Sequence, residues 1–182
     1  GAMPNYRRFR APGASYFFTV NLEDRRDTLL VDRIDDLRAA VRHAMANRAF
    51  EIVAMVVLPD HLHMLMALPA GDADYASRWS AIKSMFSRRV PKTRDIRHSL
   101  ARKRERGIWQ RRFYEHCMRD QEDLWSHINY IHYNPVKHGY VKRPMDWSFS
   151  SIHRFVRNGW LPAAWGDGDL RLPEIRVEGE RR

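Results

Sequence analysis

Apolar side chains cluster into three strand-like segments in the N-terminal part of the chain. Residues 15–22 are rich in aromatic and β-branched side chains and lie between a Pro-Gly pair and a charged run, which predicts a strand. Residues 50–58 form a nearly unbroken apolar run, which is typical of a buried strand. A Pro-Asp break follows, and residues 61–68 continue as another strand, so the last two segments predict a hairpin.

Three other segments repeat apolar side chains at helical spacing. Residues 35–47, 76–89 and 121–133 each predict a helix. The second of these is basic as well as amphipathic. We expect the third helix to end near Asn134, because Pro135 disfavours the helical conformation in the residue before it.

The remaining segments complete the predicted organisation. Residues 108–118 could supply one strand or two short ones, whereas the polar and basic residues 91–106 predict a flexible insertion. The domain is expected to span residues 6–156, followed by a tail over residues 157–182. Residues 1–5 are expected to be a disordered start that includes a protease-cleavage scar, Gly-Ala-Met. The order of elements predicts an α+β fold, an antiparallel sheet with helices packed on one face.

Composition narrows the class of protein. The 182 residues are enough for one domain, and a hydrophobic content of 44% with 12% aromatics excludes wholesale disorder. No apolar run approaches the length of a membrane span. The single cysteine, Cys117, allows no internal disulfide, which favours a cytoplasmic protein.

The net charge points to a polyanionic partner. Lysine and arginine number 32 against 22 acidic residues, a formal charge of +10. Nucleic acid fits this excess better than a membrane surface does, because no basic helix with an exposed apolar face stands out. Aromatic and basic side chains alternate in residues 6–9 and 109–114, which suits single strands. The alternative is that these rings are core and the arginines solvated.

Two histidines form the first candidate site. His61 and His63 lie one residue apart in a predicted strand, so both side chains point to one face and could share a metal ion, while Leu62 points to the other. Two ordinary strand histidines would produce the same pattern. A third ligand would favour the metal site, because two imidazoles seldom hold a catalytic metal alone.

The last predicted helix carries the second candidate site. Tyr130 and Asn134 are four residues apart and share one helix face, so a phenol that can attack a phosphodiester lies beside an amide that can bind metal. Tyr130 could equally be a core residue. Tyr133 lies about 300° around the helix from Tyr130, and His132 lies about 200° around and is expected at the surface. His116 could reach the metal site or a phosphate, or could be a surface residue.

Three sequence motifs together resemble a known family. LPDHLHMLMALP, WQRRFYEHCMR, and NYIHYNPVKHGYV followed by DWSFSS are similar to the REP-associated tyrosine transposases, which belong to the single-tyrosine branch of the HUH endonuclease superfamily. The resemblance covers residues 6–155. It implies an antiparallel sheet flanked by helices, a ferredoxin-like or RRM-like sandwich.

The resemblance also implies an activity and its residues. His61 and His63 would bind a divalent metal, Mg²⁺ or Mn²⁺, with Asn134 as a further ligand, although two imidazoles also suit Zn²⁺. Tyr130 would be the nucleophile that nicks and rejoins single-stranded, REP-type hairpin DNA through a 5′-phosphotyrosine. The family favours a monomer, with a homodimer as the alternative, and a protein associated with the nucleoid.

Basic side chains are the candidate DNA contacts. We expect the helix over residues 76–89 and the arm over residues 6–10 to bind phosphates and bases. The candidate residues are Arg7, Arg8, Lys83, Arg88, Arg89, Arg111 and Arg112. Two other functions stay open: a non-catalytic module that binds single-stranded nucleic acid, and a metal-dependent phosphodiesterase that activates water, with Tyr130 structural.

Overall fold

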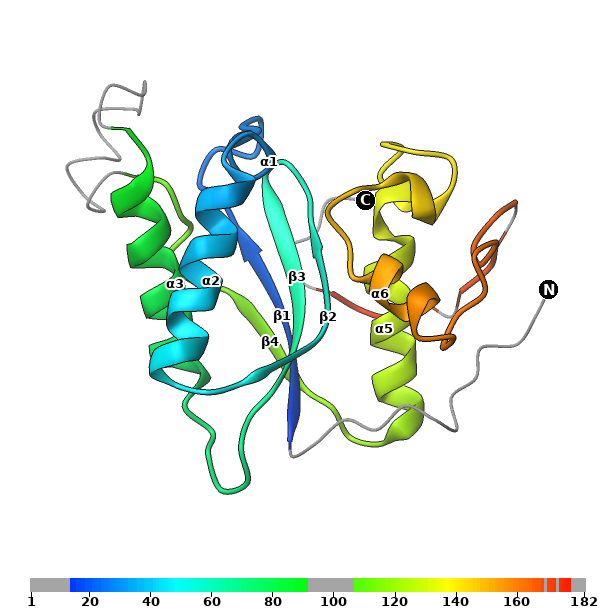
Figure 1. Cartoon of the computed structure of the whole chain (residues 1–182), viewed down its shortest axis with the longest axis horizontal. Coiled ribbons are helices and arrows are strands. Elements are labelled where there is room, and N and C mark those ends of the chain that lie inside the picture. Colours follow the sequence, from blue (N-terminus) through cyan, green and yellow to red (C-terminus); the bar gives the residue numbers. More distant parts are fainter. Residues whose placement is uncertain (1–13, 92–106, 169, 173, 178–182) are drawn as a thin grey trace.

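A four-stranded antiparallel sheet lies at the centre of the molecule (Figure 1). The computed structural model describes residues 14–91, 107–168, 170–172 and 174–177. The strands follow the order β2-β3-β1-β4 across the sheet. They are β1 (Ser15–Asn21), β2 (Glu51–Val57), β3 (His61–Ala67) and β4 (Tyr114–Cys117). All four strands were predicted, and β2 and β3 form the expected hairpin.

Helices surround this sheet. They are α1 (Leu29–Asp32), α2 (Ile34–Asn47), α3 (Tyr75–Arg89), α5 (Gln121–Lys137), the 3₁₀ helix η2 (Pro144–Asp146) and α6 (Ile152–Arg157). The three long helices match the predicted ones within a few residues. The short helices were not predicted, because elements of one or two turns are too short to produce a recognisable helical period.

Helices cover both faces of the sheet, and the expectation that they pack on one face was wrong. Phe18 and Leu62 point toward α2 and α3 and form one core with Trp79. Phe17 points the other way, into a second core with Ile128 of α5. Figure 1 shows the sheet between the α2–α3 pair and the α5–α6 pair. All seven residues of β3 are buried, because helices cover both faces of the sheet.

Helix α5 continues past its proline. It ends at Lys137 and not near Asn134, with Pro135 inside the helix. A proline in a helix removes one backbone hydrogen-bond donor. The last turn nevertheless keeps a helical hydrogen bond, because the His138 N–H donates to the Asn134 carbonyl at 3.0 Å. The extra turn matters for the site, because it carries Lys137 and His138 back toward the sheet.

The side of α5 that faces away from the sheet is covered by α6, and this buries His132. This side chain was expected at the surface but is fully buried. Its Nε2 lies 2.8 Å from Ser151 Oγ, and its ring lies 4.5 Å from the Phe155 ring of α6. Burial lowers the pKa of His132 to about 3, so the ring is neutral. The C-terminal residues therefore form a second layer over α5, and His132 joins the two layers.

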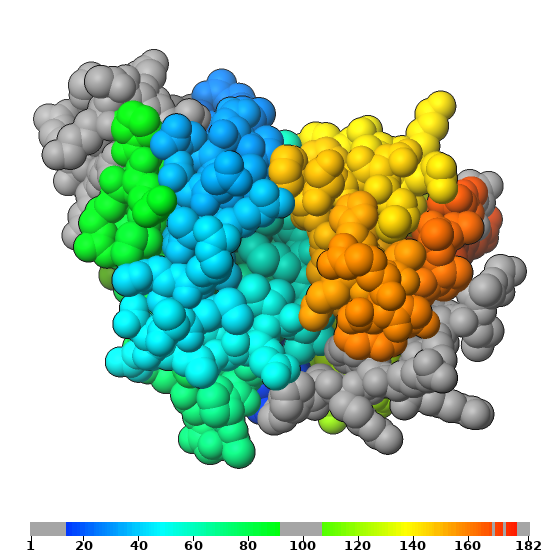
Figure 2. Space-filling model, viewed as in Figure 1, coloured from blue at the N-terminus to red at the C-terminus, as the bar shows by residue number. Residues whose placement is uncertain are grey.

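Residues 149–151 run along the outer edge of β2. The Val57 N–H donates to the Phe149 carbonyl at 2.9 Å, and the Ser151 N–H donates to the Met55 carbonyl at 2.8 Å. The Met55 N–H in turn donates to Ser151 Oγ at 2.9 Å. A groove of about 300 Å³ lies between α2 and these residues (Figure 2). The edge of β2 is thus hydrogen-bonded within the chain.

Some sequence predictions fall outside the described residues. The arm over residues 6–10 and all but the first residue of the insertion over residues 91–106 belong to this group. Among the described helices, none has both the length and the apolar character needed to cross a membrane.

Gly166 provides a stability prediction for the C-terminal layer. Its φ is +80°, and a Cβ there would lie 2.6 Å from Cγ of Pro144. We expect Gly166→Ala to lower the free energy of unfolding by about 2–4 kcal/mol, because the left-handed backbone and the overpacking each cost about 1 kcal/mol or more. Urea denaturation measures this loss. Gly159→Ala is the control, since Gly159 has a φ of +73° but open space around it. Equal losses in the two variants would contradict the clash.

Candidate metal and tyrosine site

The sheet places two histidines side by side on the face covered by α5. His61 and His63 are 2% and 0% exposed, and their ring centroids lie 5.0 Å apart. Across the antiparallel pairing with β1, His61 is opposite Asn21 and His63 is opposite Thr19. Leu62 packs into the opposite core. The predicted alternation of these three side chains is confirmed.

Hydrogen bonds orient both imidazole rings. His63 Nδ1 lies 2.9 Å from Thr19 Oγ1, and His61 Nδ1 lies 2.9 Å from Asp60 Oδ1. Asp60 also accepts a hydrogen bond from Arg25 Nε at 2.6 Å. Contacts of this kind commonly fix the tautomer of metal-binding histidines. With Nδ1 engaged in each ring, Nε2 is the nitrogen that each histidine can offer to an ion.

The charge states of these groups also fit a metal site. Burial lowers the pKa of His63 well below its usual value, so the ring is neutral, as a metal ligand must be. Burial alone would raise the pKa of Asp60, but hydrogen bonds from His61 and Arg25 outweigh it and lower that pKa to about 2. A neutral His63 ring next to a charged Asp60 carboxylate provides a suitable environment for a divalent ion.

Helix α5 brings the tyrosine to the same place. The Tyr130 ring lies 5.3 Å from the His63 ring, edge to face, and is 9% exposed. Its hydroxyl is buried and makes no hydrogen bond with the residues that the structure describes. Lys137 Nζ lies 4.8 Å above the Tyr130 ring. Asn134 is fully buried one turn after Tyr130. The structure thus brings Tyr130 next to His63, which agrees with what the family resemblance implies.

Several polar residues at this site were not foreseen, among them His138 and Asn21. The His138 ring, at the end of α5, lies 5.3 Å from the His61 ring. Burial lowers the pKa of His138 to about 4. Asn21, opposite His61 on β1, is 4% exposed. The signal for Asn21 was in the sequence: with Thr19 it forms a polar period of two within an otherwise apolar strand.

His116 is not part of this site. It lies on β4, where its Nε2 is 2.9 Å from Asp123 Oδ2. Phe17 separates the two places, because its ring contacts His63 at 5.5 Å on one side and His127 at 4.8 Å on the other.

The candidate DNA-binding cations lie in different environments. Arg88, Arg111 and Arg112 are exposed. Arg89 is exposed but forms an ion pair with Asp36 at 3.2 Å. Lys83 donates to the Gln110 carbonyl at 3.0 Å, so it holds the segment before β4. Arg7 and Arg8 lie outside the described residues.

Comparison with known proteins agrees with this geometry. Residues 13–134 match the family described as "Transposase IS200 like", a span that includes both histidines, Tyr130 and Asn134. A REP-associated tyrosine transposase of Escherichia coli strain K12 is 44% identical over 92% of this chain and 93% of its own length. A protein of Haemophilus influenzae assigned to the same class is 45% identical over 98% of this chain and 99% of its own length.

A solved structure is similar to this chain as well. It is a REP-associated tyrosine transposase bound to a REP hairpin, with a TM-score of 0.73 and 43% identity over 97% of this chain and 100% of that chain. The likeness in sequence extends through nearly the whole length of each protein. The chain therefore belongs to the IS200-like transposase family, within its REP-associated tyrosine transposase group.

Proposed function

We propose that this transposase cleaves and rejoins single-stranded DNA beside REP-type hairpins, through a metal-dependent reaction with a 5′-phosphotyrosine intermediate. The observation that carries the proposal is the position of Tyr130. Its ring lies 5.3 Å from His63, on the sheet face that presents both histidines. The solved relative bound to a REP hairpin supports hairpin DNA as the substrate.

In this proposal, His61 and His63 would hold the metal through Nε2, with Asn134 as a further ligand. A bound Mg²⁺ or Mn²⁺ ion would polarise the scissile phosphate as a Lewis acid. Asp60 and Thr19 keep the rings in place through the Nδ1 hydrogen bonds, each 2.9 Å long.

Tyr130 supplies the attacking oxygen. A phenol is largely protonated at neutral pH, so its attack requires nearby positive charge. Lys137, whose Nζ lies 4.8 Å from the ring centroid, provides one such charge on the same helix. The phenol oxygen loses its proton and attacks phosphorus, and the bond to the 3′ oxygen breaks. The 3′ oxygen gains a proton and leaves as a 3′-hydroxyl, while the downstream fragment stays attached through its 5′ phosphate. The ester conserves the bond energy, so a 3′-hydroxyl can reverse the reaction without a nucleotide cofactor.

The proposal is tested by following label from DNA to protein. Single-stranded oligonucleotides carrying a REP-type hairpin are labelled either upstream or downstream of the cleavage position and incubated with Mg²⁺ or Mn²⁺. After denaturation, only the downstream label should migrate with the protein. Cleavage without labelled protein would identify water as the nucleophile. Binding without cleavage of a hairpin that the E. coli relative does cut would favour the non-catalytic module.

A salt titration tests the contribution of the exposed cations. Affinity for the hairpin should fall as salt rises, because each neutralised phosphate contributes about 0.7 to the log–log slope on single strands. Arg111→Glu, and separately Arg88→Glu, should each reduce this slope by the contribution of about one phosphate contact. Arg157→Glu, at an exposed arginine of α6, changes the net charge equally and should leave the slope unchanged. Equal effects of all three variants would indicate general charge attraction without a defined binding face.

A further inference from the structure

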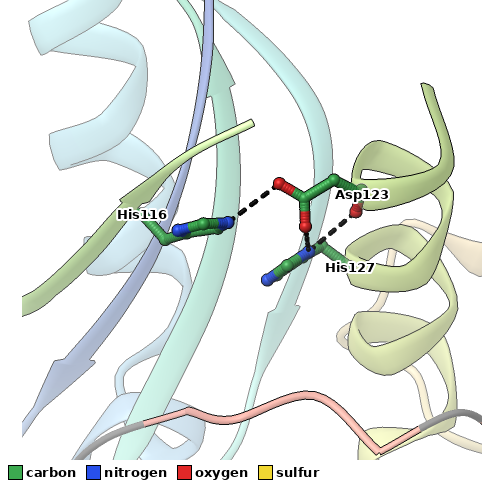
Figure 3. Close-up of side chains that lie close together, drawn as sticks. All are labelled: His116, Asp123 and His127. Carbon is green, nitrogen blue, oxygen red and sulfur yellow. Dashed lines mark hydrogen bonds and ion pairs between the residues drawn. The ribbon is translucent and has the colours of Figure 1, made fainter. Parts of the chain in front are cut away.

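Three metal-binding side chains meet between β4 and α5, separate from the histidine pair. His116 comes from β4, and Asp123 and His127 come from the first two turns of α5 (Figure 3). One ligand atom from each residue lies within 4.8 Å of the others. Nε2 of His116 is 2.9 Å from Asp123 Oδ2, and Nδ1 of His127 is 3.4 Å from Asp123 Oδ1. We call these residues the β4–α5 cluster.

The β4–α5 cluster is buried but reachable. The side chains of Asp123 and His127 are 5% and 4% exposed, and that of His116 is 28% exposed. The three residues line a cavity of about 340 Å³, together with Tyr114, Arg119 and residues 174–176. An ion could therefore enter from the cavity and be held on its inner side by groups largely withdrawn from water.

The spacing and charge of the donors fit a transition metal. Ligands bound at about 2.0–2.1 Å in a tetrahedral site lie roughly 3.3 Å from one another, so three donor atoms within 4.8 Å of one another need only small shifts to meet at one ion. Burial would raise the pKa of Asp123, but hydrogen bonds from the Arg119 backbone N–H and His116 lower it overall, so the carboxylate is charged. Burial lowers the pKa of His127, so its ring is neutral and one nitrogen carries a lone pair.

A hydrogen-bond network without metal is the competing explanation. Asp123 Oδ2 already accepts from the Arg119 N–H at 3.0 Å as well as contacting His116. His127 Nδ1 also lies 2.8 Å from the Asp123 backbone carbonyl, so this ring must exchange that bond or use Nε2 to bind an ion. A network alone needs neither the second imidazole beside the carboxylate nor a cavity beside it. Those two features favour a ligand.

We propose that His116, Asp123 and His127 bind a second metal ion of the zinc class. Two imidazoles with one carboxylate form a donor set that suits Zn²⁺. The ion would join β4 to α5 one to two turns before Tyr130. The His127 ring contacts Phe17 at 4.8 Å, and Phe17 contacts Tyr130 at 5.9 Å, so the ion would steady the helix that presents the tyrosine. This site does not depend on the proposed DNA reaction.

The test counts bound zinc in tag-free, full-length protein that has first been stripped of metal. A His61→Ala, His63→Ala double variant removes the histidine pair. In equilibrium dialysis, the free zinc concentration is buffered below the dissociation constant for isolated surface histidines. This variant should keep one zinc per chain. Adding Asp123→Asn should reduce the count to zero, and so should adding His116→Gln, a milder change at a partly exposed position. His43→Gln, at an exposed histidine of α2, should change nothing.

Each outcome has a definite meaning. Loss of zinc in both cluster variants, with circular dichroism unchanged in at least one, supports the second site. No zinc in the double variant, or one zinc retained after Asp123→Asn and His116→Gln, would overturn it. Cleavage is not part of this readout, so a failure of the proposed DNA reaction would leave the zinc count unaffected.

Discussion

We expect Tyr130→Phe to abolish the covalent DNA adduct and cleavage, while the protein folds and binds hairpin DNA as before. The substitution removes a single oxygen and keeps the ring contacts with Phe17 and His63. That oxygen makes no hydrogen bond with the described residues, so its loss should not lower the free energy of unfolding. Denaturing gels measure the adduct, thermal unfolding measures stability, and gel shifts measure affinity.

Tyr133→Phe is the matched control for this variant. Tyr133 lies on the same helix, but its ring packs against Trp165 at 6.4 Å in the C-terminal layer. Cleavage by this variant should equal that of the wild type. If Tyr133→Phe lost the adduct and Tyr130→Phe retained it, the nucleophile would lie on the other side of α5, and the proposed site would be wrong.

The second large effect is expected from the histidine pair. His61→Ala, and separately His63→Ala, should reduce cleavage by about 10²–10⁴-fold, since a Lewis acid contributes several kcal/mol to the transition state. Affinity for DNA should change little, because the excess of basic residues carries most of it. Cleavage rates and gel shifts on the same preparations separate the two effects.

His61→Ala is the cleaner of the two variants. Asp60 keeps its hydrogen bond from Arg25 when the His61 ring is removed, so the buried carboxylate still has a charged partner. His63→Ala empties a fully buried position beside Thr19, and its stability must be measured in parallel. Wild-type cleavage by folded His61→Ala in chelator-treated buffer would exclude a metal role for the pair.

Local pattern was enough to predict the strands and the direction of the key side chains. The alternation in β3 placed His61 and His63 on one face of the sheet. Helical spacing placed Tyr130 and Asn134 on one face of α5. Neither pattern reveals which face of the helix meets which face of the sheet. Only the family resemblance joined the two halves of the site, and the 5.3 Å contact between His63 and Tyr130 agrees with it.

The errors share a physical origin in packing between distant segments. His132 was assigned to the surface because α5 was expected to bury a single stripe, whereas α6 covers its second side. The helix was expected to end near Asn134, but it continues to Lys137. That extension is what places His138 against His61. Helix propensity predicts the free-energy cost of a proline inside a helix. It does not predict the tertiary contacts that offset this cost.

The pairing of residues 149–151 with β2 has a consequence for self-association. An exposed strand edge is a template for another chain, and two copies of a sheet protein can join into one continuous sheet there. In this molecule, backbone groups of Met55 and Val57 are already engaged by Ser151 and Phe149. An incoming strand would first have to displace that segment, together with the Ser151–His132 contact behind it. Intermolecular β-pairing at this edge, whether in a native dimer or in an aggregate, would therefore begin with partial unfolding of the C-terminal layer.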